Sequence, residues 1–198
     1  MGGSNNKQTS HNRRFYKRRT AIFSNTLRAL GKYRGRVTIR QISNVSGFPR
    51  QVFYRYFKNI NQAIGECERW LHQEYELHLN SVPLSGTDAA INRGYFTVSF
   101  VFMAQNKEVF YQICSDMAVQ DILYRMLKVL YPKLRLTWLP AGTPTPTING
   151  ERVDLYLRLL TGVICQWGKE TKCDIDKAEL YIRKMVKITE DVTGRNVF

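Results

Sequence analysis

Residues 38–57, which read TIRQISNVSGFPRQVFYRYF, constrain the fold more than any other part of the sequence. Thr38 and Gln41 match the T-x-x-Q capping box, in which the hydroxyl and the amide satisfy free backbone N–H groups in the first turn of a helix. Gly47 is the residue best able to take the left-handed backbone angles of a tight turn, so this helix must end by that position. Pro49 suits the first turn of a following helix, where a missing N–H costs nothing. The stretch therefore predicts two short helices joined by a turn.

The second of these helices is amphipathic. Phe53, Tyr56 and Phe57 share one flank at i, i+3 and i+4. The side chains directed largely elsewhere are Arg50, Gln51, Tyr54 and Arg55. An earlier helix is expected at residues 15–33, where Phe23, Leu27 and Leu30 recur at helical spacing. Three such helices predict a helix-turn-helix unit, which in other proteins is either a DNA-binding head or a purely structural element.

Helical spacing of apolar residues continues through the rest of the chain. Further helices are expected at residues 59–80, 88–104, 106–115, 117–131, 151–168 and 175–191, with a loop at 136–150. Asp176 with Glu179 is expected to open the last helix. No segment has the alternation of a strand. The sequence therefore predicts an all-α protein with a disordered tail at 1–12, a three-helix helix-turn-helix domain at 13–58 and an all-helical domain at 59–198.

The net charge of +14 belongs entirely to the first third of the chain. Residues 1–65 contain fourteen Lys and Arg and no Asp or Glu, whereas residues 66–198 contain sixteen of each sign. A solvated surface normally mixes both signs, so this run favours a polyanionic partner, either nucleic acid or an anionic membrane. Residues 1–12 offer no amphipathic anchor, and the apolar run at 95–104 is too short to cross a bilayer. We therefore expect DNA as the partner and no membrane.

Metal, cofactor and catalytic sites are not indicated by the sequence. The cysteines are Cys67, Cys114, Cys165 and Cys173. Their spacing lacks a CxxC pair and a nearby histidine set, so we expect small buried side chains in a reducing cytosol rather than a zinc site or a disulfide framework. The dinucleotide, P-loop, zinc-protease and serine-hydrolase motifs are missing, and His72 and His78 are six residues apart, which does not place them on one helix face. We expect a cytoplasmic, nucleoid-associated protein that is not an enzyme.

The order of features from Thr38 to Phe57 resembles the N-terminal domain of the TetR family of bacterial transcription regulators, whose pattern is roughly T-x-x-x-I-A-x-x-A-G-V-S-x-x-x-L-Y-x-H-F. Gly47 and Tyr54 fall at the family's separations from Thr38 and Ile42. The sequence GVICQW at 162–167, followed by a charged loop and a last amphipathic helix, is similar to the family's dimerising pair. The resemblance implies a repressor that binds palindromic operator DNA as a homodimer and releases it when a small apolar or aromatic effector binds.

The resemblance also implies roles for individual residues of the DNA-binding domain. Arg50 and Gln51 would read base edges in the major groove, since Arg pairs bidentately with guanine and Gln with adenine. Val52 would meet a thymine methyl group or, equally, pack inside the domain. The expected phosphate contacts are Arg36, Thr38, Arg40, Tyr54, Tyr56 and Lys58. The basic arm, which would follow the DNA backbone or enter the minor groove, comprises Arg13, Arg14, Lys17, Arg18 and Arg19.

A dimer is expected because one helix-turn-helix buries too little surface for useful specificity. Residues 151–168 carry two apolar stripes. A helix that is covered on one side needs only one such stripe, so a second covering surface is expected. The residues expected at the dimer interface are Val153, Leu157, Leu160, Gly162, Ile164 and Trp167, with Tyr181, Met185 and Ile188 from the last helix. The other stripe comprises Leu155, Leu159 and Val163. The alternative is that both stripes are covered within one subunit.

Members of the TetR family usually bind a small molecule among their central helices. In this chain aromatic and flexible apolar side chains are abundant between residues 95 and 124. The expected pocket residues are Tyr95, Phe96, Phe100, Met103, Phe110, Tyr111, Met117 and Tyr124, and for each of them an ordinary core position is the alternative. A second functional hypothesis is a TetR-like DNA-binding adaptor or nucleoid-associated protein that has no effector and is controlled by a protein partner.

Overall fold

The computed structural model describes two long stretches of the chain, residues 37–136 and 147–193, and part of the preceding segment. The residues described in that segment are Arg18, Ala21, Ile22, Ser24, Asn25, Thr26, Arg28, Ala29, Lys32 and Tyr33. Every regular element among the described residues is helical, which confirms the predicted all-α class. The chain divides into two compact units, Met1–Leu71 and His72–Phe198. The division falls inside helix α4 (Ile60–Leu79) rather than between residues 58 and 59, where the sequence placed it.

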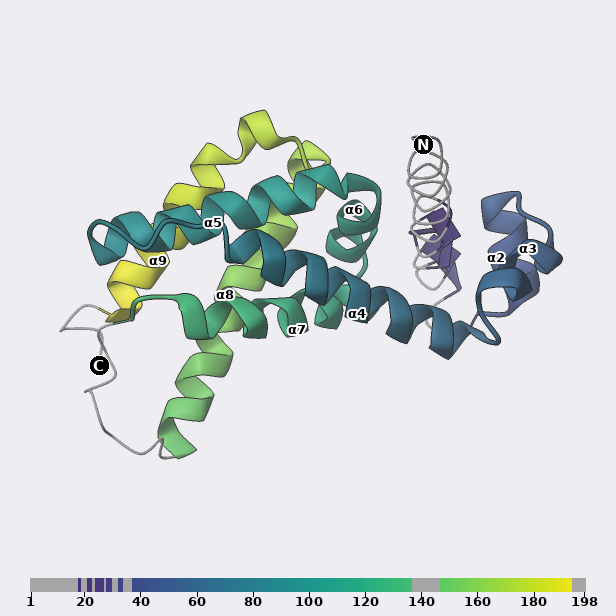
Figure 1. Ribbon diagram of the computed structural model, residues 1–198, viewed down its shortest axis with the longest axis horizontal. Coiled ribbons are helices and arrows are strands. Elements are labelled where there is room, and N and C mark those ends of the chain that lie inside the picture. Colours follow the sequence, from purple (N-terminus) through teal and green to yellow (C-terminus); the bar gives the residue numbers. More distant parts are fainter. Residues whose placement is uncertain are drawn as a thin grey trace, which may run out of the picture. The chain divides into compact units, whose positions relative to one another are not determined.

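The first unit contains α2 (Ile39–Ser46) and α3 (Arg50–Tyr56), which pack against each other (Figure 1). The predicted capping box is present, since the Gln41 N–H donates to the Thr38 hydroxyl at 3.3 Å and the Thr38 N–H donates to Gln41 Oε1 at 2.8 Å. Gly47 ends α2 with φ at 69°, the left-handed conformation predicted for the turn. Pro49 lies immediately before α3 as its N-cap and not inside its first turn. Its φ of −58° is compatible with either position.

Apolar side chains anchor the short helices to the core of the first unit. Phe53 and Phe57 are 3% and 1% exposed, and their ring centroids are 5.7 Å apart. Ile42 of α2 is equally well buried. Burial of one such Phe side chain stabilises the unit by roughly 1.5–3 kcal/mol. In the earlier segment Ile22 and Ala29 are buried, whereas the predicted apolar residues Phe23, Leu27 and Leu30 lie outside the described residues.

The second unit contains the end of α4 and five further α-helices in its described part. These are α5 (Asp88–Gln105), α6 (Lys107–Ser115), α7 (Gln120–Leu130), α8 (Thr147–Thr171) and α9 (Glu179–Thr193). Short 3-10 turns are present at Met117–Val119, Tyr131–Lys133 and Ile175–Lys177. The unit is therefore a helical bundle, as the sequence predicts.

Two helix starts in the second unit differ from the prediction. α8 begins at Thr147, inside the predicted loop, of which residues 137–146 lie outside the described residues. α9 begins at Glu179 and not at residue 175. The reason is Asp174, whose carboxylate accepts the Asp176 N–H at 3.1 Å and caps a separate 3-10 turn. The Asp176 and Glu179 pair therefore does not form the predicted capping box.

Helix α8 provides much of the core of the second unit, because it packs against α6, α7 and α9 (Figure 1). Its Trp167 is fully buried, and the indole N–H donates to the Asp174 carbonyl at 3.0 Å. The Tyr156 hydroxyl lies 2.8 Å from the hydroxyl of Thr189, so a buried polar contact also joins α8 to α9. These contacts fix which side of α8 faces inward.

Candidate nucleic-acid interface

The outward side of α3 carries polar and cationic side chains. We call Arg50, Gln51, Tyr54 and Arg55 the α3 outer face; all are exposed, and Tyr54 has 57% of its surface in contact with solvent. Val52 is half-buried. Gln51, Tyr54 and Arg55 are separated by three and four residues, which groups them on one side of the helix, and Arg50 adjoins them in its first turn. Burial of Phe53 and Phe57 thus determines which side chains α3 presents.

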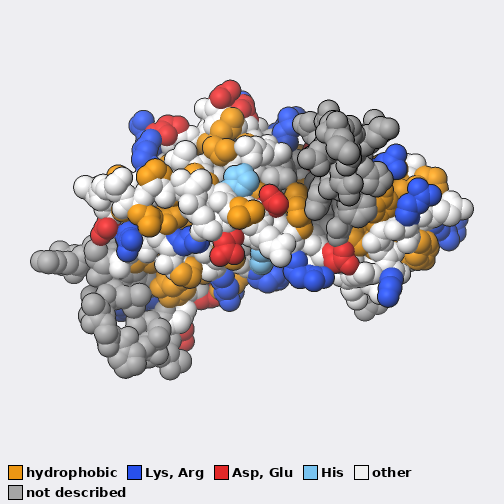
Figure 2. Space-filling model, viewed as in Figure 1, with side chains coloured by type: hydrophobic (Ala, Val, Ile, Leu, Met, Phe, Trp, Pro, Cys, Tyr) orange, Lys and Arg blue, Asp and Glu red, His pale blue; other side chains and the backbone are white. Residues whose placement is uncertain are grey.

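The charged groups of this face have no internal partner among the described residues. Arg50, Arg55 and Gln51 make no side-chain hydrogen bond or ion pair with any of them. The reason is compositional, because residues 1–65 hold no carboxylate that could pair with an arginine. Figure 2 shows Lys and Arg side chains over α2 and α3 with apolar side chains between them. The guanidinium groups therefore keep all their donors for an external acceptor.

The other predicted phosphate contacts occupy different environments. Lys58 and Arg40 are exposed and have no ion pair with a described residue. Tyr56 is half-buried, with its ring centroid 6.5 Å from that of Phe57. Thr38 is exposed, but its hydroxyl donates to Gln41 Oε1 at 3.0 Å and accepts the Gln41 N–H. The capping box thus already uses the donor of Thr38.

The basic arm falls almost entirely outside the described residues. Of its members only Arg18 is described, and it is exposed. The others, Arg13, Arg14, Lys17 and Arg19, lie outside the described residues, as does the predicted phosphate contact Arg36.

Two further exposed side chains lie beside the predicted residues. Arg55 belongs to the α3 outer face one turn after Gln51, and Asn44 is exposed on α2 one turn after Arg40. Asn44 makes no side-chain hydrogen bond with a described residue. In the sequence, both residues can be identified because each lies four positions, or about one helical turn, after a predicted DNA contact.

The predicted effector-pocket residues lie mostly in the core of the second unit. Phe96, Phe100, Met103 and Phe110 are fully buried and Tyr95 is 5% exposed. Tyr111 and Tyr124 are half-buried. Met117 is 83% exposed and points to solvent. Five of these eight side chains are therefore core residues.

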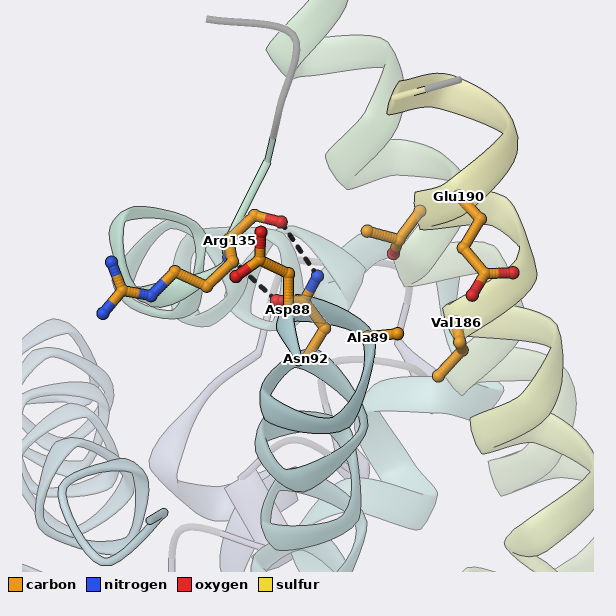
Figure 3. A pocket seen from close by; sticks show the side chains of 7 residues that line it. Asp88, Ala89, Asn92, Arg135, Val186 and Glu190 are labelled. Carbon is orange, nitrogen blue, oxygen red and sulfur yellow. Dashed lines mark hydrogen bonds between the residues drawn. The ribbon is translucent and has the colours of Figure 1, made fainter. Parts of the chain in front are cut away.

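A cavity and a groove among the described residues of the second unit are both lined by residues other than the predicted pocket residues. A cavity of about 120 Å³ lies between the start of α5, Arg135 and the end of α9, with Asn92 at its wall (Figure 3). The Asn92 amide is occupied there, because it donates to the Arg135 carbonyl at 3.0 Å and accepts the Arg135 N–H at 2.8 Å. A shallow groove of about 330 Å³ runs between Val82 and Thr97.

The predicted dimer stripe of α8 is covered by its own chain. Leu157, Leu160, Ile164 and Trp167 are at most 1% exposed. Met185 and Tyr181 of α9 are likewise buried, and Val153 and Ile188 are half-buried. The prediction that the fully buried residues form an intersubunit contact is therefore wrong. Side chains already packed within one subunit have no exposed surface for a second copy.

The opposite side of α8 is the one that remains uncovered. We call Leu155, Leu159, Gly162, Val163 and Gln166 the α8 outer face. Leu155 and Leu159 are 55% and 43% exposed, Val163 is half-buried, and Gly162 has nothing within 4 Å of the position a side chain would take. Of the predicted interface residues, Gly162 alone belongs to this exposed face.

Comparison of the chain with models of known families, with curated proteins and with solved structures found no match. The described residues contain no group of three or more His, Cys, Asp or Glu side chains arranged to hold a metal ion. Across the ranges 37–136 and 147–193, no helix is both long and apolar enough to span a membrane.

Proposed function

We propose that this protein is a sequence-specific DNA-binding transcription regulator that inserts α3 into the major groove. The observation that carries the proposal is the α3 outer face, where exposed arginines without internal partners flank a glutamine on a helix anchored from behind by Phe53 and Phe57. A face meant only for solvation would be expected to include carboxylates, and the first 65 residues contain none. The resemblance of residues 38–57 to TetR regulators supports the same reading.

The chemistry of the interface follows from the residue types. Arg50 offers two parallel donors to the O6 and N7 atoms of guanine, and Gln51 pairs with the N6 and N7 atoms of adenine. Val52 is half-buried, and the exposed part of its side chain would contact a thymine methyl group. Tyr54, Arg55, Arg40 and Lys58 supply phosphate contacts, which add affinity and fix the position of α3 without reading sequence.

Binding as a homodimer is part of the proposal. One seven-residue recognition helix gives few base contacts, and two copies on a palindrome double the surface and the number of bases read. The α8 outer face supports a second copy as its occupant, because Leu155 and Leu159 are exposed on the same side as Gly162, where a neighbouring helix can approach closely.

A footprint on the DNA upstream of the protein's own gene, repeated at several salt concentrations, tests the function. The expected result is a protected site with two symmetric halves about one helical turn apart. The logarithm of the binding constant should fall linearly with the logarithm of the salt concentration. The slope is proportional to the number of phosphates that the protein neutralises. Uniform, position-independent protection at low salt would refute sequence-specific regulation and leave a non-specific DNA binder. Absence of any binding at low salt would refute the proposal altogether.

A second mode of control is favoured by one observation. The predicted effector-pocket side chains are mostly packed as core, and the cavity beside Asn92 and the groove between Val82 and Thr97 are both lined by other residues. This favours the adaptor, a DNA binder controlled by a protein partner, over a regulator released by a small apolar ligand. A thermal-shift screen with small aromatic and apolar metabolites separates the two. A metabolite that raises the melting temperature and also releases DNA would restore the effector-controlled regulator.

A further inference from the structure

Three cysteines that are far apart in the sequence meet in the core of the second unit. We call Cys114 of α6, Cys165 of α8 and Cys173, which follows α8, the thiol cluster. All are free and buried, with exposures of 0%, 5% and 1% respectively. The sequence predicts buried cysteines but gives no sign that they gather, because their separations fit no motif. The cluster has no part in the proposed DNA interface.

Gly168 is the point around which the cluster forms. A Cβ atom built on Gly168 would lie 2.6 Å from both Cβ and Sγ of Cys114 and 3.5 Å from Sγ of Cys173. The helix backbone of α8 therefore passes directly beside the Cys114 side chain. Cys165 is one turn before Gly168 on the same side of α8, so it also faces this point. The structure thus places three sulfurs around one glycine.

The backbone after α8 is arranged so that Cys173 reaches the cluster. Lys172 and Cys173 both have positive φ, 57° and 59°, which non-glycine residues seldom adopt. Two consecutive left-handed residues reverse the chain immediately after the helix. The reversal brings a third thiol back to α8, and such unfavourable conformations persist only where the surroundings hold them.

The thiols of Cys114 and Cys165 differ in acidity and exposure. The Cys114 thiol donates to the Ile164 carbonyl at 3.8 Å. The neighbouring Cys165 and Cys173 sulfurs raise the pKa of Cys114, whereas Cys114 lowers the pKa of Cys165. Lys169, one turn after Cys165, lowers the pKa of Cys165 further. Cys165 is also the most exposed of the three. Of the pair Cys114 and Cys165, Cys165 thus combines the lowered pKa with the larger exposure, and the thiolate is the reactive form of a cysteine.

We propose that the thiol cluster is a peroxide-reactive site in which Cys165 is oxidised first and Cys114 then closes an intramolecular disulfide. In the first step the Cys165 thiolate attacks a hydroperoxide, an S–O bond forms, the O–O bond breaks, and an alcohol or water leaves with the thiol proton. In the second step the Cys114 sulfur attacks the sulfenic sulfur, an S–S bond forms, the S–O bond breaks, and water leaves. Two electrons pass from the two thiols to one peroxide.

Peptide mapping of the full-length protein tests this site. The native protein is treated with hydrogen peroxide, its remaining thiols are alkylated, and it is digested without reduction. The expected result is one disulfide per chain, joining Cys114 to Cys165, with both thiols recovered after dithiothreitol. The site is refuted if all thiols survive in the folded protein, or if the bond joins two chains, involves Cys67, or joins Cys114 to Cys173.

Matched variants assign the two roles. Cys165→Ser should abolish the bond, whereas Cys114→Ser should leave Cys165 as a sulfenic acid that dimedone traps. Cys67→Ser is the control and should form the bond as the unsubstituted protein does. Trapping of dimedone on Cys114 in the Cys165→Ser variant would reverse the roles and overturn the assignment. Because the peptide mapping uses the unsubstituted protein, it tests the proposed disulfide even if a variant fails to fold.

Discussion

The rings of Phe100 and Trp167 meet edge to face in the core of the second unit, with centroids 4.7 Å apart. Phe100 was a candidate for an effector pocket and Trp167 for a dimer interface, yet both are fully buried within one chain. The pair therefore joins α5 to α8 as part of the hydrophobic core.

We expect Phe100→Ala to lower the free energy of unfolding by about 3–5 kcal/mol, because it removes a buried ring and leaves a cavity beside Trp167. Chemical denaturation followed by far-ultraviolet circular dichroism measures the change. Met117→Ala is the control, since a side chain that is 83% exposed should change stability by less than about 0.5 kcal/mol. A loss at Phe100 no larger than that at Met117 would contradict the core assignment.

Gly47→Ala should destabilise the protein by roughly 1–2 kcal/mol through the backbone alone. The position has a φ of 69°, and a Cβ atom there would meet nothing within 4 Å, so no steric clash adds to the cost. Gly47→Asn is the matched comparison, because asparagine tolerates the left-handed region better. Equal stability of the two variants in denaturant titrations would show that the turn does not depend on this conformation.

Base readers and phosphate contacts should give different binding signatures. We expect Arg50→Ala to cost about 1–3 kcal/mol at the operator and to relax specificity at one base pair. Lys58→Ala should weaken all sequences alike and reduce the salt slope by about one. Fluorescence anisotropy with an operator and its single-base variants separates these effects. Lys187→Ala on α9 is the control for loss of one exposed cation, and an equal effect there would remove α3 from the interface.

Leu159→Asp should dissociate the proposed homodimer without unfolding the subunit. The side chain is 43% exposed on the α8 outer face, so a carboxylate is solvated in the single chain but would be buried without a partner in a dimer. Sedimentation velocity should show a shift towards monomer. Leu77→Asp on α4, where the leucine is 64% exposed, is the control. Persistence of the dimer in the Leu159 variant would place the contact on another surface.

Glu179 should contribute to stability against acid. The Arg183 guanidinium, 2.7 Å away, and that of Arg93 hold the pKa of this carboxyl below its ordinary range. Because the folded-state pKa is the lower one, the contribution is fully present above the unfolded value of about 4.3 and is lost as pH falls through the folded value. Glu179→Gln should therefore flatten the pH dependence of the melting temperature below about pH 5. A profile in the Glu179→Gln variant as steep as that of the unsubstituted protein would contradict this contribution.

Local signals made the start and end of α2 predictable, whereas the role of α8 depended on tertiary packing. The T-x-x-Q box and Gly47 specify their structure within a few residues, and both were confirmed. α8 has apolar residues on two sides, and periodicity cannot tell which stripe its neighbours cover. Contacts between distant residues, such as that of Trp167 with Phe100, decide this. The start of α9 was misplaced for a related reason, because Asp174 captures the Asp176 N–H and diverts the chain into a 3-10 turn.

The contact between Gly168 and Cys114 also limits how the chain can vary. A methyl group at residue 168 would overlap the Cys114 side chain. Even the smallest substitution, glycine to alanine, therefore requires the surrounding structure to shift. A library of random variants selected for folding should return glycine at 168 while tolerating many residues at 155 and 159 on the opposite side of the helix. The side of α8 that contains Gly168 thus tolerates few substitutions, whereas the side that contains Leu155 and Leu159 tolerates many.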